Sequence, residues 1–248
     1  MYYYKLPHTP IIDLYADMLS QTHLLIAGAT GSGKSTLIDG LLQTILHRAP
    51  TRQQYIILDR KYTTLRAYAN APHSMRHARS LDEMVYTIRD TIDLMQRRFD
   101  YLEHHPADFS HVYLIIDELA DLMTTRKRQV APLLQELLQL AREARIHVIA
   151  ATQTPHHTIT PTTLTCNFPA RVALRTATAG QSRIIIDQSG AELLPDPQTE
   201  HRAQCLYRHG AITELWNLPA PRTETAYLID YWSHAQKHFD GIRRRRTA

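Results

Sequence analysis

The stretch that most constrains this chain is His23–Thr36, which reads HLLIAGATGSGKST. A short apolar run is followed by glycines at positions 28, 31 and 33 and then by Lys34-Ser35-Thr36, which fits the phosphate-loop pattern G-x-x-x-x-G-K-[ST]. Glycines let the backbone curl so that successive N–H groups point at phosphate oxygens, and the following helix adds the positive end of its dipole. An accidental Gly/Ser-rich turn of this form is expected in roughly one chain in a hundred of this length. The sequence therefore predicts a nucleotide phosphate site between a strand and a helix.

The predicted ATP-binding residues form this loop and its exit, and they are Gly28, Ala29, Thr30, Gly31, Ser32, Gly33, Lys34, Ser35 and Thr36. We expect Lys34 to reach the β- and γ-phosphates and the Ser35 hydroxyl to ligate Mg²⁺. ATP and Mg²⁺ are therefore the expected cofactors.

A second apolar run, HVYLIID at residues 111–117, ends in the acidic pair Asp117 and Glu118. Continuous apolar runs are typical of parallel strands that are buried on both faces. A phosphate loop requires an acid at a neighbouring strand end for Mg²⁺ and a base that orients the attacking water. We assign Asp117 to the first role and Glu118 to the second. The alternative is that the pair only caps the next helix, and for Glu118 both interpretations can hold together.

Two further polar residues flank the next buried strand, residues 146–151. Gln153 follows this strand and is a candidate sensor of the γ-phosphate, although a lone Gln there fits an ordinary surface role equally well. Arg142 ends the preceding helix. In a monomer it is a basic helix end favoured by the dipole, whereas in a ring it can act as an arginine finger on a neighbour's phosphate.

Apolar periodicity predicts strands that alternate with helices. The predicted strands are 23–27, 54–58, 111–117, 146–151, 168–174 and a hairpin of 203–207 with 212–216; the predicted helices are 34–47, 80–102 (capped by Ser80 with Glu83), 130–141, 181–186 and 224–239. This alternation predicts an α/β fold with a mainly parallel central sheet flanked by helices, as in P-loop NTPases. We divide the chain into a lead-in (1–22), in which residues 11–19 form a short strand or a helical turn, a single α/β domain (23–240) and a basic tail (241–248).

The formal net charge of +4 is due to Arg243-Arg244-Arg245-Arg246 in the tail, because without them 24 basic residues balance 24 acidic ones. These four arginines either form a disordered solubilising end or contact a DNA backbone. Cys166 and Cys205 show neither metal-ligand spacing nor a disulfide framework, which favours a reduced, cytoplasmic compartment. The chain has no run of about 18 apolar residues and no signal-peptide core, so we expect a soluble protein.

Four segments occur in order between His23 and Leu194, and they are GATGSGKS, IIDELADLM, IHVIAATQTP and NFPARVALRTATAGQSRIIIDQSGAELL. They resemble the motor domain of the FtsK/SpoIIIE family of DNA translocases. The last segment is the most specific, because phosphate loops occur in many families. The resemblance implies a RecA-like fold and a hexameric ring ATPase that pumps double-stranded DNA. It also implies the roles given above for Lys34, Ser35, Asp117, Glu118 and Gln153, and it places Arg142 where the family has its arginine finger.

The chain departs from the family pattern at several places. The strand-end motif D-P-K appears as Asp59-Arg60-Lys61, Thr154 replaces the arginine of T-Q-R-P, Arg145 replaces a common glycine, and PDPQTEHRA replaces a glycine-rich continuation. The family's membrane region and winged-helix DNA reader have no counterpart. We therefore expect a stand-alone motor of plasmid, phage or conjugative-element type. The alternatives are an ATPase that energises protein secretion or conjugative transfer, and a nucleotide-binding switch with a relaxase or replication partner.

Overall fold

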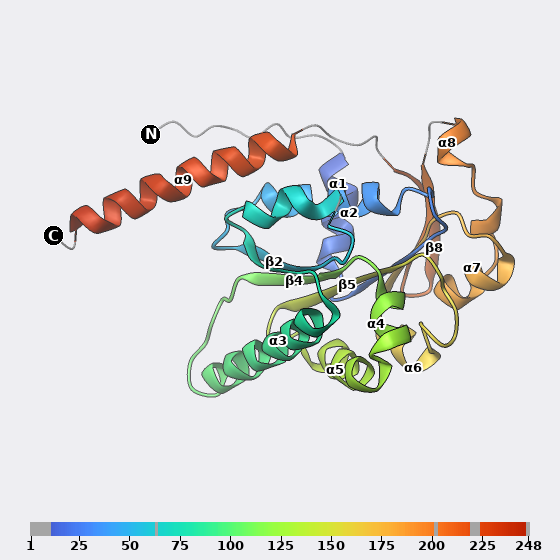
Figure 1. The fold of residues 1–248 in the computed structure, drawn as a ribbon, viewed down its shortest axis with the longest axis horizontal. Coiled ribbons are helices and arrows are strands. Elements are labelled where there is room, and N and C mark those ends of the chain that lie inside the picture. Colours follow the sequence, from blue (N-terminus) through green and yellow to red (C-terminus); the bar gives the residue numbers. More distant parts are fainter. Residues whose placement is uncertain (1–10, 63, 201–202, 219–223, 247–248) are drawn as a thin grey trace.

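The computed structural model describes residues 11–62, 64–200, 203–218 and 224–246, and it is organised around one eight-stranded sheet (Figure 1). The strand order is β3-β2-β4-β5-β1-β6-β7-β8. Neighbours from β3 to β6 are parallel, whereas β7 pairs antiparallel with β6 and β8. The strands are β1 (Leu24–Ala27), β2 (Gln53–Leu58), β3 (Ser74–Ala78), β4 (His111–Ile116), β5 (Ile146–Thr152), β6 (Ala170–Ala173), β7 (Gln204–His209) and β8 (Ile212–Asn217). The predicted mainly parallel α/β sheet is confirmed.

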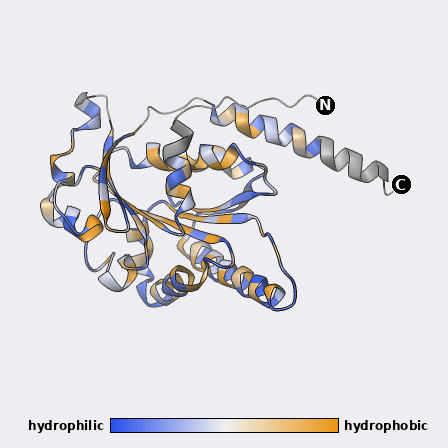
Figure 2. Ribbon diagram, turned by 180° about the vertical axis from the view of Figure 1, so that it is seen from behind, coloured by the Kyte–Doolittle hydropathy of each residue, from blue (hydrophilic) through white to orange (hydrophobic). Residues whose placement is uncertain are grey.

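Helices cover both faces of the sheet and form two hydrophobic cores (Figures 1 and 2). One face is covered by α1 (Ile11–Ser20), α2 (Lys34–Leu46), the 3-10 helix η1 (Thr64–Asn70) and α9 (Thr225–Arg246). The other is covered by α3 (Leu81–Leu102), α4 (Leu119–Thr125), α5 (Lys127–Leu140), α6 (Thr162–Thr165) and α7 (Ala179–Ile186); η2 (Ala191–Leu193) and α8 (Pro197–Glu200) follow α7. This double cover explains why β1 and β5 are buried at every residue.

Most predicted elements are present, and the differences have physical reasons. β3 escaped prediction because its sequence SMRHA is mostly polar and has no β-branched residue. Residues 11–20 form a helix, α1, whose Tyr15, Met18 and Leu19 belong to the core beside α2. The predicted capping box of α3 is confirmed, because the Ser80 hydroxyl accepts from Glu83 N while the Glu83 carboxylate accepts from Ser80 N.

The predicted separate basic tail is wrong with respect to the backbone. α9 continues through Arg246, so Arg243–Arg246 form its last turn instead of following it. Arginine is a good helix former and the single Gly241 does not end the helix. The side chains of these four arginines lie outside the described residues.

The start of α9 is fixed to the helix that follows the phosphate loop. Trp232 Nε1 donates to Leu46 O at 2.6 Å, and the Trp232 ring packs edge-on against His73. Gln43 Nε2 donates to Thr225 Oγ1 at 2.7 Å. The rest of α9 projects away from the body (Figure 1). α2 and α9 are therefore joined at two places.

Within the described residues, no helix combines the length and apolarity needed to cross a bilayer. Cys166 is exposed, Cys205 is buried, and both are free thiols.

Candidate nucleotide site

The phosphate loop connects β1 to α2 and has the backbone that its glycines predict. Gly31 and Gly33 have φ values of 79° and 97°, a left-handed region in which a side chain is strained. The loop is anchored on both sides, because Gly28 N donates to Thr152 O at 3.2 Å and Ala29 N donates to Arg175 O at 2.8 Å. It therefore lies between the carboxyl ends of β5 and β6, the edge at which parallel sheets bind ligands.

Lys34 joins the loop to the acidic pair after β4. Its Nζ donates to Asp117 O at 2.6 Å and lies 3.7 Å from Asp117 Oδ1 and 3.5 Å from Glu118 Oε2. Lys34 is only 5% exposed. The structure therefore brings together three residues that sequence reasoning assigned to one site, although Lys34 lies more than eighty positions before Asp117 and Glu118.

Glu118 is the most heavily hydrogen-bonded of these residues. Its carboxylate accepts from Thr152 Oγ1 at 2.9 Å and from Gln153 N at 3.1–3.2 Å. It also accepts from Ala120 N at 3.3 Å and so caps α4. The capping interpretation is confirmed for Glu118, whose Oε2 also lies 3.5 Å from Lys34 Nζ; its catalytic role stays a prediction.

Gln153 completes the cluster from the end of β5. Its Oε1 accepts a hydrogen bond of 3.0 Å from Thr30 Oγ1, which lies in the phosphate loop. The side chain of the predicted sensor is therefore next to the loop.

The acidic pair lies in a partly dry environment. Burial raises the pKa of Asp117 above its usual value, Lys34 opposes this rise, and the nearby carboxylate of Asp59 adds to it. Asp59 follows β2 and is itself buried, with Oδ1 accepting from Lys61 N at 2.9 Å. Two carboxylates at adjacent strand ends thus give this edge a negative field that Lys34 partly balances.

The residues also fit the predicted metal. Ser35 lies in the first turn of α2, is exposed, and shares the sheet edge with Asp117. Nowhere in 11–62, 64–200, 203–218 or 224–246 do three or more His, Cys, Asp or Glu residues gather as a cation site. A Mg²⁺ site beside a phosphate loop uses few protein ligands together with water and substrate phosphates, so Ser35 and Asp117 stay the predicted ligands.

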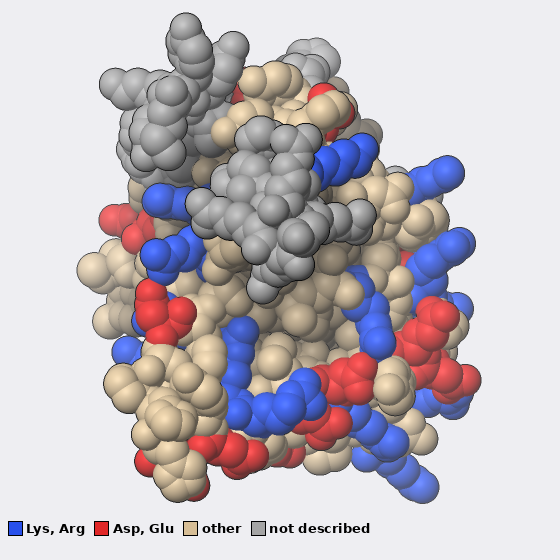
Figure 3. All heavy atoms as spheres, turned by 90° about the vertical axis from the view of Figure 1, so that its left-hand side faces the viewer, with Lys and Arg blue, Asp and Glu red and all other residues tan. Residues whose placement is uncertain are grey.

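Arg142 lies away from this cluster. It is exposed in the turn between α5 and β5, and Arg145 N donates to its carbonyl at 2.9 Å. β5 is seven residues long, so at about 3.3 Å per residue Arg142 is roughly 20 Å from Gln153, at the opposite sheet edge. The molecular face that contains this edge carries basic and acidic side chains next to each other (Figure 3). Arg142 therefore does not complete the site of its own chain.

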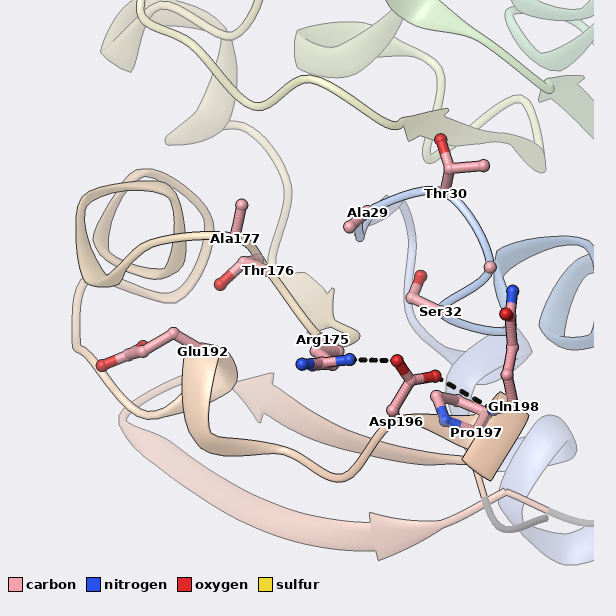
Figure 4. A pocket seen from close by; sticks show the side chains of 11 residues that line it. Ala29, Thr30, Ser32, Arg175, Thr176, Ala177, Glu192, Asp196, Pro197 and Gln198 are labelled. Carbon is pink, nitrogen blue, oxygen red and sulfur yellow. Dashed lines mark hydrogen bonds and ion pairs between the residues drawn. The ribbon is translucent and has the colours of Figure 1, made fainter. Parts of the chain in front are cut away.

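A pocket of about 330 Å³ opens beside the loop on the β6 side (Figure 4). Its walls are the loop residues Ala29–Ser32, the segment Arg175–Ala177 after β6, and Glu192 with Asp196–Gln198. Sequence reasoning missed Arg175, Asp196 and Gln198. For Arg175 a signal existed, because it closely follows a predicted strand at the same sheet edge as the loop.

These features define a class of protein. A phosphate loop between β1 and α2, an acidic pair after β4 and a polar residue after β5, all on a mainly parallel sheet, make this chain a P-loop NTPase with a RecA-like sheet.

Sequence comparisons identify the family within this class. A family model described as FtsK/SpoIIIE family matches residues 9–114. DNA translocase FtsK of Listeria monocytogenes is 34% identical over 205 residues, which cover 73% of this chain and 27% of that protein. The chain therefore contains a domain of the FtsK/SpoIIIE family.

Solved structures with low sequence identity share the fold. The pCW3 conjugation coupling protein TcpA, solved with ATPγS, has a TM-score of 0.75 and 19% identity, covering 89% of this chain and 66% of that one. The type VII secretion ATPase EccC of Thermomonospora curvata has a TM-score of 0.72 and 21% identity, covering 85% and 28%. This chain spans about a quarter of the length of the curated relatives it matches.

Proposed function

We propose that this chain is the motor of an ATP-dependent double-stranded DNA translocase that works as a hexameric ring. The observation that carries the proposal is the contact of Lys34 with Asp117 and Glu118 beside the phosphate loop. The identity with DNA translocase FtsK supports DNA as the substrate. A plasmid, phage or conjugative-element origin is part of the proposal, and the likeness to a conjugation coupling protein supports it.

The residues of the cluster have separable roles in ATP hydrolysis. Lys34 binds the β- and γ-phosphates, and these phosphates compete with the carboxylates of Asp117 and Glu118 for its ammonium group. Glu118 is the general base: its carboxylate accepts a hydrogen bond from the attacking water and so orients it. Gln153, whose Oε1 already accepts a hydrogen bond from Thr30 Oγ1, senses the γ-phosphate and so couples nucleotide binding in the loop to β5. Ser35 and Asp117 would hold Mg²⁺, which neutralises charge that develops on the phosphates.

Arg142 supports the ring part of the proposal. It lies about 20 Å from its own site, so as an arginine finger it acts on the nucleotide of the next subunit. Each site is then complete only at a subunit interface, as the family resemblance implies. This arrangement makes hydrolysis depend on assembly.

The test is ATP turnover measured alone, with linear double-stranded DNA and with single-stranded DNA, together with the particle mass in ATPγS. We expect strong stimulation by the duplex and a mass near six chains. Lys34→Ala is the matched inactive control. ATP turnover that neither double-stranded nor single-stranded DNA changes would contradict the proposal.

Two other functions give different results in the same assay. An ATPase that energises secretion, which the likeness to EccC favours, is stimulated by a protein partner and not by DNA. A nucleotide-binding switch with a relaxase or replication partner binds ATP without turnover.

A further inference from the structure

Arg175 is a cation that lies beside the phosphate loop and has no role in the cluster described above. Its carbonyl accepts from Ala29 N at 2.8 Å, so its backbone is fixed to the loop. Its side chain lines the 330 Å³ pocket together with Ala29–Ser32 (Figure 4). Ser32 is 3% exposed, and its hydroxyl lacks a hydrogen-bond partner among the described residues. The pocket thus has a cation and an unused hydroxyl next to a loop built to bind phosphate.

The present partner of Arg175 is a carboxylate of its own chain. Arg175 Nη1 lies 2.5 Å from Asp196 Oδ2, and the two side chains are 41% and 39% exposed. The other carboxylate oxygen accepts from Gln198 N at 3.0 Å. Gln198 in turn lies against the loop, because a Cβ added to Gly31 would overlap its amide. Residues 196–198 therefore form a strap that runs from Arg175 to the tip of the phosphate loop.

The energetics favour an exchangeable contact. An ion pair with side chains this exposed contributes about 0–1 kcal/mol, so little is lost when it opens. A guanidinium binds phosphate in a bidentate geometry, as it binds carboxylate, and phosphate carries more negative charge. Backbone hydrogen bonding from Gln198, followed by Arg175, holds the pKa of Asp196 below its usual value, so at neutral pH Asp196 is an anion that competes for Arg175.

We propose that Arg175 is a nucleotide-phosphate ligand, and that Asp196 occupies the place of a phosphate oxygen on it until the nucleotide displaces the carboxylate. The strap then leaves the loop when a nucleotide enters, and ATP affinity depends on the competition between Asp196 and phosphate. This inference rests on nucleotide binding by the phosphate loop. It does not depend on DNA, on the ring or on hydrolysis.

The experiment is equilibrium binding of fluorescent ATP and ADP analogues to the full chain. Arg175→Ala should raise Kd about 10-fold, because one charged hydrogen-bonding contact is lost. Asp196→Asn should lower Kd about threefold or more, since the asparagine oxygen still accepts from Gln198 N but no longer competes for Arg175. The double variant should match Arg175→Ala. Arg52→Ala is the control, because Arg52 forms an exposed pair with Asp108 away from this pocket.

The outcomes separate this inference from the proposed function. If Arg175→Ala changes Kd less than twofold while Lys34→Ala strongly weakens binding, the inference is overturned and the motor proposal is left intact. Weaker binding in Asp196→Asn also overturns it, because the pair would then be a structural support. Opposite shifts in the two single variants, in a protein that DNA does not stimulate, support the inference and contradict the motor proposal. Unchanged melting temperatures of the Arg175 and Asp196 variants exclude misfolding as the cause of their shifts.

Discussion

Replacement of Lys34 should destabilise the folded protein as well as weaken nucleotide binding and abolish turnover. The Lys34 ammonium lies against two acids whose side chains are only 14% and 12% exposed. Removing one partner of a buried ion pair costs about 3–5 kcal/mol. Some water reaches these carboxylates, so we expect the lower end, about 3 kcal/mol in the free energy of unfolding. For a chain of this length that lowers Tm by about 6–12 °C.

The loss should depend on pH with a definite sign. Burial already raises the folded-state pKa of Asp117, and removal of Lys34 raises it further because Lys34 is the main opposing charge. A carboxyl group with a raised folded pKa stabilises the fold when it is protonated, and that stability is lost as pH rises through the folded pKa. The difference in the free energy of unfolding between wild type and Lys34→Ala should therefore become smaller as the pH falls from about 8 to about 5.

Urea unfolding at both pH values, without nucleotide, measures this difference. Lys34→Met keeps most of the side-chain volume and should show the same pH dependence, which separates lost charge from lost packing. Lys237→Ala, at an exposed position on α9, should change stability by less than about 0.5 kcal/mol. A Lys34→Met protein as stable as wild type at neutral pH, or a loss that is equal at both pH values, would refute the electrostatic argument.

Three further predictions concern turnover and DNA. Glu118→Gln should still bind ATP but hydrolyse it several orders of magnitude more slowly in a steady-state assay, since a neutral amide cannot act as base; near wild-type turnover would contradict the assignment. Arg142→Ala should bind ATP normally and lose on the order of 10³-fold in rate. Mixing it with Lys34→Ala should restore part of the turnover, and no recovery in confirmed mixed rings would exclude action in trans. Truncation after Ile242 removes Arg243–Arg246 and should reduce the slope of log affinity against log salt by roughly 3.6, measured by DNA titration, with no change in turnover per bound ring; an unchanged slope would mean that these arginines do not touch DNA.

The sequence predicted the core of the site because strand ends converge in a parallel sheet. Apolar runs identified β1, β4 and β5, and each is followed by the residues that meet around Lys34. Local patterns were sufficient there, since the fold itself brings carboxyl ends of parallel strands to one edge.

Contacts made by irregular segments could not be predicted in this way. The pair between Arg175 and Asp196 depends on the path of a loop that has no periodicity. Arg145, which stands where the family commonly has glycine, keeps a left-handed backbone with φ 52°. It does so because its guanidinium pairs with Asp108 and donates to Phe109 O, and these partners come from another loop. Sequence shows the departure from glycine, but only the three-dimensional contacts explain how the conformation is retained.

The attachment of α9 to α2 has a geometrical consequence. α9 has 22 residues, which at 1.5 Å per residue make a rod of about 33 Å. Its inner end is held by Thr225 and Trp232 on the helix that begins at Lys34. A rotation of α2 by about 5° that α9 follows rigidly would carry the far end through about 3 Å. A small rotation beside the phosphate loop thereby becomes a displacement about as long as a hydrogen bond at the far end of α9. That end of the helix carries the four arginines.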